Sequence, residues 1–390
     1  MKISGGEPEP TRYRWLVLFA SLFAFIAYAF AFQAAPPLIL SVMAEFAVSN
    51  AQASLTMAFV LLPGIFLTLP AGLLVGRYGI KPVGFASLIC VILGSLVTAM
   101  ANSFVTLLIG RLILGIGGSI IVTAAPATIA QWFKRRELGR AMGIFGINMP
   151  LATVIAFPTS SLLLLAYGWR FPFYVSLSVG VVAAIVFMVV IKEGPFVQRK
   201  KTISIHLLRD REIWKLGLVW LFFNAAALSF TAWGPTLLEK FQSMPKVQAG
   251  FLASLLSWAA IFTVPVYGYL SDKTGKRKPF ALLGAVLMAL VFVALAFTSN
   301  VLLASSIVAL GIAAAMIPPI VSSLPPEILG PSLASEGFGV TGMCANIGAA
   351  LAQPFLGLLL DYTQSYIFCM LSLSALSVVG AIAAYSLKTN

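Results

Sequence analysis

The sequence is poor in the residues on which soluble proteins, disulfide scaffolds and metal sites depend. Only 9% of its 390 residues are Asp, Glu, Lys or Arg, whereas an ordinary soluble domain carries about 25%. It has one histidine, His206, in a basic polar stretch, and three cysteines, Cys90, Cys344 and Cys369, all inside apolar runs. These shortages exclude a soluble globule and disfavour a disulfide framework or a metal cluster.

The sequence consists largely of long apolar runs, and 60% of its residues are hydrophobic. A helix rises 1.5 Å per residue, so a run of about 20 residues crosses a hydrocarbon layer of about 30 Å. We therefore predict an all-α membrane protein with twelve transmembrane helices. They are expected near residues 13–40, 50–75, 82–101, 105–130, 139–165, 171–192, 213–237, 247–270, 279–298, 301–322, 337–360 and 365–386.

Positive charge predicts the orientation of these helices. Of the 25 Lys and Arg residues, 21 fall in or beside segments on the side of the N-terminus, and 3 fall on the opposite side. Cytoplasmic loops of membrane proteins carry such an excess of Lys and Arg. We expect a multi-pass protein of the inner (plasma) membrane with both termini in the cytoplasm.

The runs form two sets of six that repeat each other. We predict an N-terminal bundle over 1–192, a basic linker over 193–212 and a C-terminal bundle over 213–390. The linker is either solvated or an interfacial helix on anionic lipid. Duplicated units in parallel orientation are typical of transporters that move two halves about a central site. The matching residues, offset by 196, are Gly72 with Gly268, Gly79 with Gly275, Gly115 with Gly311, Gly143 with Gly339, Gly146 with Gly342, and Pro158 with Pro354.

Two loops carry a further repeated pattern. The chain after the eighth run reads Gly268-Tyr-Leu-Ser-Asp272-Lys273-Thr-Gly275-Lys276-Arg277-Lys278. The loop after the second run keeps Gly72, Arg77, Gly79 and Lys81, but has Gly76 in place of the aspartate. Glycines permit close helix approach and tight turns, and the cations favour the cytoplasmic face. With twelve runs in two repeats, these loops resemble the signature of the major facilitator superfamily.

The resemblance implies a fold of two six-helix pseudo-symmetric bundles and a gating role for both loops. In that family the loop aspartate faces a helix N-terminus in the other half and holds the cytoplasmic side shut. Asp272 is therefore expected to contact the start of the fifth run near Gly139, and we call this contact the latch. The equivalent latch of the first-half loop is absent or is made by other residues. The alternative is that both loops are basic turns that fix topology alone. The candidate gating residues are Gly268, Asp272, Lys273, Gly275, Arg277, Gly72, Arg77, Gly79 and Lys81.

Arg111 is the one charged residue deep inside a run, in Arg111-Leu-Ile-Leu-Gly115-Ile-Gly117-Gly118. This stretch is similar to an element of the family's fourth span. Burying an arginine at the centre of a membrane helix costs about 2.5–3.5 kcal/mol on insertion scales, and carbonyls, water or an anion must offset that cost. Two interpretations stay open: an arginine bonded to carbonyls for packing, or one that attracts an anionic substrate.

Other polar and aromatic residues fall in runs that line or flank the central cavity in the family. Amides offer donors and acceptors, and aromatic rings hold apolar substrate parts; each could instead bond neighbouring helices. With Arg111, the candidate substrate-binding residues are Tyr28, Gln33, Asn148, Asn224, Trp233, Trp258, Asn346 and Gln353. Pro36-Pro37 and Pro318-Pro319 mark either helix ends or hinges at the gates.

These features predict a secondary active or facilitative transporter of a small organic solute by rocker-switch alternating access. Arg111 favours an anion such as a carboxylate. No acidic residue or histidine lies at mid-run, so no proton carrier is evident, and residues 143–158 lack the Gly-Pro pair usual in the family's antiporters.

A multidrug/proton efflux transporter is the alternative, and a non-transporting sensor is the alternative of another class. We expect no enzymatic activity, cofactor, metal or nucleic acid, and a monomer whose partners are its small-molecule substrate and membrane lipid.

Overall fold

The computed structural model describes residues 12–195, 210–329 and 334–388. Within these ranges, twelve helical stretches are long and apolar enough to cross a membrane, which confirms the predicted all-α membrane fold. His206 and most of the expected linker lie outside the described residues.

The first half contains α1 (Tyr13–Gln33), η1 (Pro36–Leu38), α2 (Ile39–Phe46), α3 (Asn50–Tyr78), α4 (Ile80–Ala99), α5 (Phe104–Ala130), α6 (Arg135–Phe145), α7 (Asn148–Tyr167) and α8 (Phe171–Val190). The second half contains α9 (Arg211–Phe241), α10 (Lys246–Thr274), α11 (Lys278–Phe297), α12 (Asn300–Ala314), α13 (Pro318–Leu329), α14 (Ala334–Thr363) and α15 (Tyr366–Tyr385).

Some membrane spans are broken into shorter helices close to prolines. Pro36 and Pro37 have no N–H to donate to carbonyls one turn earlier, so α1 ends at Gln33 and a 3₁₀ turn joins it to α2. Pro318 begins α13 after a break in its span, since proline is tolerated in the first turn of a helix. Both proline pairs therefore mark helix breaks, and their service as hinges stays a prediction.

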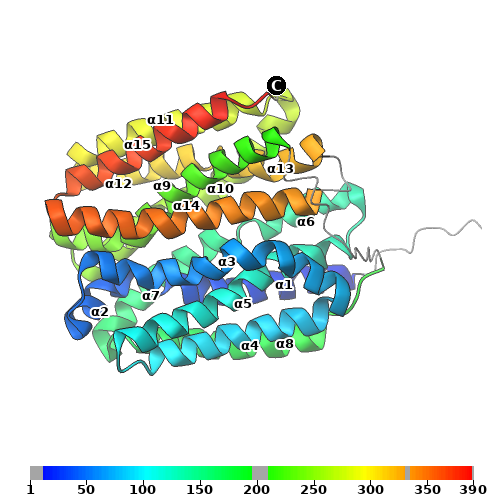
Figure 1. Cartoon of the computed structure of the whole chain (residues 1–390), viewed down its shortest axis with the longest axis horizontal. Coiled ribbons are helices and arrows are strands. Elements are labelled where there is room, and N and C mark those ends of the chain that lie inside the picture. The colour runs from blue at the N-terminus through cyan, green and yellow to red at the C-terminus, as the bar shows by residue number, and fades with distance from the viewer. Residues whose placement is uncertain (1–11, 196–209, 330–333, 389–390) are drawn as a thin grey trace, which may run out of the picture.

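The helices form two bundles, one from each half of the chain. Figure 1 shows the first-half helices below and the second-half helices above, with the start of α1 and the end of α15 at the same end of the molecule. We call that end the inner end and the opposite end the outer end, after the predicted orientation. The arrangement fits two six-helix units.

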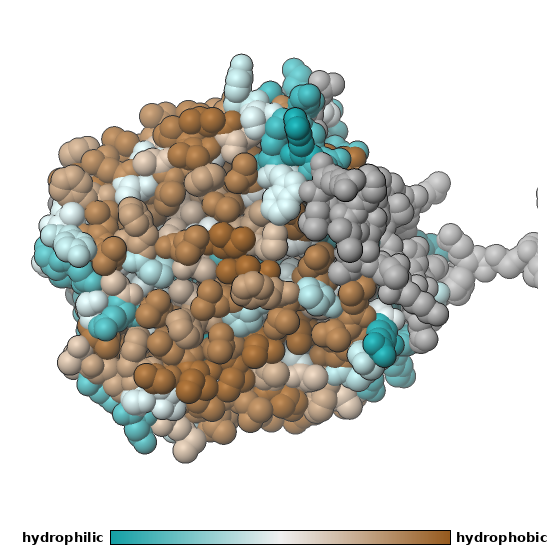
Figure 2. Space-filling view, viewed as in Figure 1, coloured by the Kyte–Doolittle hydropathy of each residue, from teal (hydrophilic) through white to brown (hydrophobic). Residues whose placement is uncertain are grey.

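The surface between the two ends is apolar. Figure 2 shows hydrophobic residues over the middle of the face in view and hydrophilic residues gathered toward both ends. Large side chains such as Phe66 and Leu351 are 73% and 68% exposed. An apolar surface this extensive is unstable in water and is the surface expected against lipid tails.

Glycines on α5 bring it close to three neighbouring helices. A Cβ at Gly115 would overlap the Val60 carbonyl of α3, one at Gly117 the Ser87 carbonyl of α4, and one at Gly118 the Tyr28 ring of α1. In the second half, a Cβ at Gly311 would overlap the Leu256 carbonyl. Gly311 and Leu256 are offset by 196 from Gly115 and Val60, so the sequence repeat also exists in three dimensions.

The substitution Gly311→Ala is expected to lower the free energy of unfolding by about 1–3 kcal/mol, because the added methyl group overpacks a helix contact. Thermal unfolding of the purified protein measures this. Gly143→Ala is the matched control, since nothing lies within 4 Å of a Cβ at Gly143 and alanine favours a helix over glycine. Equal loss of stability in both variants would contradict the packing role of Gly311.

Candidate functional site

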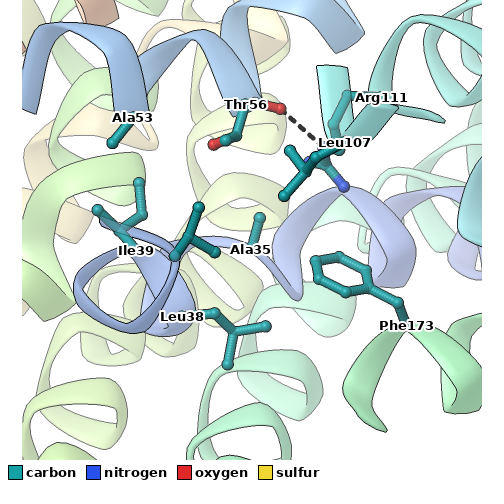
Figure 3. Close-up of a pocket in the computed structure, with 9 residues that line it drawn as sticks. Ala35, Leu38, Ile39, Ala53, Thr56, Leu107, Arg111 and Phe173 are labelled. Atoms are coloured by element: carbon teal, nitrogen blue, oxygen red, sulfur yellow. Dashed lines mark hydrogen bonds between the residues drawn. The ribbon is translucent and has the colours of Figure 1, made fainter. Parts of the chain in front are cut away.

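Arg111 is fully buried inside the first bundle and binds three backbone carbonyls. Its Nε donates to the Thr56 carbonyl at 2.7 Å, Nη1 to Ala31 at 2.9 Å and Nη2 to Phe32 at 3.1 Å. Pro36 cannot donate to Phe32 four residues earlier, so Arg111 supplies a bond that the proline break removes. The guanidinium thus joins α1, α3 and α5, as the packing interpretation expects (Figure 3).

A small cavity lies beside this guanidinium, between the break in α1 and the outer parts of α3, α5 and α8. Its volume is about 10 Å³, about enough for one water molecule. Arg111, Thr56 and Phe173 line it together with aliphatic side chains, and the buried Thr56 hydroxyl has no hydrogen-bond partner. An organic anion does not fit this space, and the substrate-binding role of Arg111 stays an untested prediction.

Most of the other candidate binding residues bond neighbouring backbone or helices. Gln33 donates to the Thr153 hydroxyl of α7 at 2.5 Å, whereas Asn148 and Asn224 donate to the carbonyls of Phe145 and Trp220, both at 2.7 Å. These bonds hold helices and helix ends in place. Binding roles for these residues therefore remain predictions.

Four candidates lie along or beside α10 and α14. The Trp233 indole donates to the Gln353 carbonyl at 3.2 Å, so the structure brings these two residues together. The Asn346 side chain packs against Gly64 of the first half, because a Cβ added at Gly64 would overlap the Asn346 amide. Trp258 is 39% exposed and stacks on Phe262.

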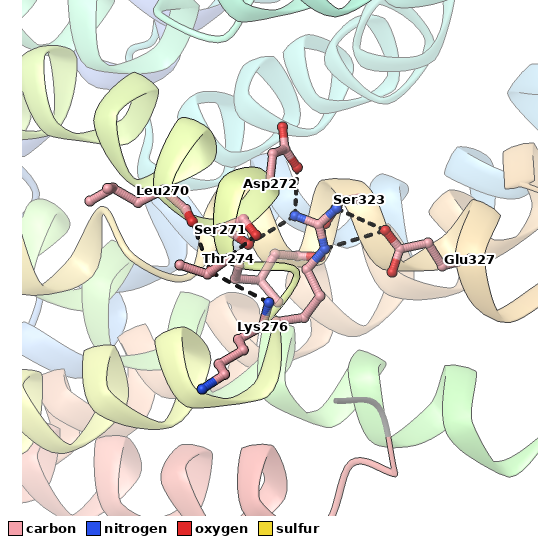
Figure 4. Close-up of polar contacts among 9 residues, drawn as sticks. Leu270, Ser271, Asp272, Thr274, Lys276, Ser323 and Glu327 are labelled. Carbon is pink, nitrogen blue, oxygen red and sulfur yellow. Dashed lines mark hydrogen bonds and ion pairs between the residues drawn. The ribbon is translucent and has the colours of Figure 1, made fainter.

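The loop after α10 forms a compact ionic cluster (Figure 4). The Arg277 guanidinium bonds the Ser271 hydroxyl at 2.8 Å, Asp272 at 2.6 Å and Glu327 of α13 at 2.8 Å. Burial by itself would lower the pKa of Arg277, but the bonds to Glu327 and Asp272 outweigh it and raise that pKa above its usual value. Gly275 ends α10 with φ of 66°, a conformation that glycine adopts without strain.

The expected contact between Asp272 and the start of the fifth span is not made in this structure. The Asp272 side chain is 70% exposed and pairs with Arg277 of its own half, and nothing lies within 4 Å of a Cβ at Gly139. The inner ends of α6 and α10 share no extensive packing contact, and the carboxylate accepts a hydrogen bond from Arg277 instead. The latch therefore stays a prediction about a state in which these ends meet.

The first-half loop has no acid at the positions equivalent to Asp272 and Glu327, although the Glu193 carboxylate lies beside Gly79. Gly79 turns the chain with φ of 87°, and Arg77 lies over the Tyr78 ring at 5.2 Å. The residue offset by 196 from Glu327 is Gln131, which accepts from the Gly194 N–H at 3.2 Å. Gly76 and Gln131 therefore stand where the second half has the two acids that bind Arg277.

The two bundles meet mainly along two helix pairs, α3 with α14 and α7 with α10, and η1 of the first half also contacts α9 of the second. Near the outer end, a Cβ at Gly357 of α14 would overlap the Asn50 backbone of α3, and one at Gly250 of α10 would overlap Ser161 of α7. Near the inner end, open space lies beside Gly139 and Gly143 of α6. On this side of the molecule the halves thus pack together near the outer end, while α6 makes no comparable contact with α10.

This architecture agrees with a family model described as Major Facilitator Superfamily, which matches residues 17–246 and 242–389. The chain belongs to the major facilitator superfamily. The probable nitrate/nitrite antiporter NarK1 of Thermus thermophilus is 26% identical over 70% of this chain and 63% of its own length. The inner membrane transport protein RhmT of Escherichia coli is 25% identical over 83% of this chain and 82% of its own. The uncharacterized MFS-type transporter YhcA of Bacillus subtilis is 34% identical, but the match spans only 33% of its length.

Solved structures show the same superfamily fold. A bacterial homolog of the human lysosomal transporter Spinster, in an inward-facing and occupied conformation, matches with a TM-score of 0.80 and 17% identity. The match covers 97% of this chain and 98% of that one. This likeness establishes the fold and leaves the substrate open.

The structure adds ionic contacts at both ends of the molecule that the sequence did not single out. Arg14 of α1 pairs with Glu137 of α6 at 2.5 Å, and Glu45 of α2 pairs with Arg170 at 2.5 Å. Asp361 of α14 binds Asn50 across the two halves. Each of these acids has a partner more than 120 residues away along the chain, and no local sequence pattern identifies such a partner.

Proposed function

We propose that this superfamily transporter moves a small anion across the inner (plasma) membrane by alternating access of its two bundles, acting as a monomer with both termini in the cytoplasm. The observation that carries this proposal is that α7 packs on α10 near the outer end, whereas α6, which continues the same span toward the inner end, makes no comparable contact with α10. Two repeated bundles that contact each other differently at their two ends can exchange one closed end for the other.

An anionic substrate is supported by the names of relatives and by the buried charge of Arg111, which binds three carbonyls and has no acidic partner among the described residues. NarK1 and the probable nitrate/nitrite transporter NarK2 of Mycobacterium tuberculosis are named for inorganic anions. Arg111 lies inside the first bundle, where its charge acts on a nearby anion through the low-dielectric interior. Organic carboxylates and nitrate are therefore the first candidate substrates.

A multidrug efflux function is the second candidate, because a quinolone resistance transporter of Acinetobacter baumannii is 24% identical over 83% of this chain. In this chain the Trp258–Phe262 pair is exposed and offers an aromatic surface for apolar drugs. The two candidates differ in the charge and size of the ligand.

A ligand screen followed by uptake measurements tests the proposal. A ligand present at 100 times its dissociation constant stabilises the protein by about 2.7 kcal/mol, so thermal unfolding with nitrate, carboxylates, amino acids, sugars and dyes identifies the class. We expect stabilisation by an anion, and uptake of that anion into proteoliposomes. Stabilisation by dyes alone, with no anion uptake, would favour efflux and contradict the anion proposal.

A further inference from the structure

The α3–α14 pair forms a seam between the bundles that contains polar residues. Several residues of α14 are spaced four or seven positions apart, so they lie along one face of the helix. Their contacts show that this face packs against α3. A Cβ at Gly339 would overlap Leu69, Asn346 overlaps a Cβ built at Gly64, and a Cβ at Gly357 would overlap Asn50. Gln353 and Asp361 lie on the same face, seven residues after Asn346 and four after Gly357. We call this face with its α3 partners the polar seam.

Asp361 ties the outer end of the polar seam across the two halves. Its Oδ1 accepts from the Asn50 backbone N–H at 2.9 Å and from the Asn50 amide at 2.7 Å, and its Oδ2 accepts from the Ala51 N–H at 2.8 Å. The Ser49 hydroxyl accepts from the Gln52 N–H within the first half. The first N–H groups of α3 are thus satisfied, two of them by a carboxylate of the other bundle, which also complements the helix dipole.

Gln353 lies in the same seam but, unlike Asp361, its side chain has no hydrogen-bond partner. Its side chain is 1% exposed, and neither its amide nitrogen nor its amide oxygen has a hydrogen-bond partner. A buried amide without partners is costly, because it has given up its bonds to water. Since Gln353 faces α3, this cost falls on the state in which the two helices are packed together.

The repeat provides an internal comparison. Phe157 and Leu165 of α7 occupy the positions offset by 196 from Gln353 and Asp361. Phe157 is fully buried and Leu165 is 64% exposed. The α7–α10 seam therefore carries neither the carboxylate nor the amide, and this pair of opposing polar groups belongs to the α3–α14 seam alone.

We propose that Asp361 and Gln353 are positioning residues that set how often the outer end opens during transport. Asp361 holds the outer end closed through the N-terminus of α3, and the Gln353 amide favours opening because it gains hydrogen bonds to water when α3 and α14 separate. The inference rests on the alternating access proposed above. It assigns the two residues effects of opposite sign on one equilibrium.

Spin-label distances in the full chain, reconstituted in lipid nanodiscs, test this assignment. Labels at Asn102→Cys and Ser299→Cys report the outer end, and labels at Met142→Cys and Lys276→Cys report the inner end, with the three native cysteines replaced. These sites are exposed or half-exposed in the structure. Asp361→Asn is expected to raise the ratio of outer-open to outer-closed molecules about tenfold, since it weakens charge-assisted bonds to a helix N-terminus.

Gln353→Met is expected to lower the same ratio about fivefold, because it replaces the unpaired amide by an apolar group of similar shape. The double variant should return close to the wild-type ratio. Glu239→Gln is the matched control, since Glu239 is also at the outer end but pairs with Lys246 of its own half; it should leave the ratio unchanged. Asn50→Ala, which removes one of the three donors, should have a smaller effect than Asp361→Asn.

An Asp361→Asn ratio equal to that of Glu239→Gln, or a Gln353→Met shift toward the open state, would overturn the assignment while alternating access survives. A single distance distribution at both ends in the wild type and every variant would instead overturn alternating access, and this inference with it. Because distances are measured directly, the outcome does not depend on knowing the substrate.

Discussion

Replacing Arg111 by alanine is expected to lower the free energy of unfolding by about 3–5 kcal/mol. The change leaves the carbonyls of Ala31, Phe32 and Thr56 without their buried donor, and it empties the space of the largest fully buried polar side chain among the described residues. Buried unsatisfied groups and core cavities each cost a few kcal/mol. Thermal unfolding of the purified transporter without ligand measures the effect.

Arg111→Lys separates this packing role from substrate binding. Lysine keeps the charge, but its compact ammonium lacks the planar fork that reaches three carbonyls at once, so most of the stability should still be lost. Arg140→Ala is the control, because Arg140 is exposed and lies over the Trp15 ring. If Arg111→Ala unfolds at the wild-type temperature but no longer binds the anion found in the screen, Arg111 is a substrate residue and the packing interpretation is wrong.

The second large effect is expected for Asp272→Asn, which should reduce transport about tenfold while the protein remains inserted. A carboxylate at a helix N-terminus contributes roughly 0.3–2 kcal/mol, and tenfold corresponds to about 1.4 kcal/mol. Asp272 is the aspartate of the only loop that keeps the full pattern, and its exposed carboxylate is free to leave Arg277 and meet α6 when the inner ends approach. Uptake by proteoliposomes with equal protein content measures the change.

Glu327→Gln serves as the control for that experiment. It breaks the bond between Arg277 and α13 within the second half and leaves the predicted contact with the first half available. We expect it to slow transport less than Asp272→Asn. Normal uptake by a well-inserted Asp272→Asn protein would contradict the gating role and leave the loop as a basic turn that fixes topology.

Much of the fold follows from the sequence because hydropathy is a local property. Twelve apolar runs long enough to span a bilayer can only become helices there, and the structure confirms them. The repeat offset of 196 also predicted equivalent packing, as Gly115 and Gly311 demonstrate. A strip of small and polar residues on α14, from Gly339 to Asp361, was a signal of the seam with α3 that sequence reasoning did not use.

The partners of the polar residues could not be predicted in the same way. The sequence left two interpretations of Arg111 open, because its depth in a run does not reveal which carbonyls lie near it. The contact of Asp272 with the fifth span depends on how the two bundles are tilted, and that tilt is not encoded in the loop motif. Gln353 was recognised as a polar residue, but its lack of any partner becomes visible only when α3 covers it.

Composition, run length and motif spacing were sufficient to predict a membrane protein with two repeated sets of six helices and to indicate its superfamily, because each of these signals is local along the chain. The packed helices were needed to show that Arg111 supplies a bond missing at a proline break and that Asp361 caps a helix of the other bundle. Such bonds join residues up to 311 positions apart, and their formation depends on the packing of whole helices.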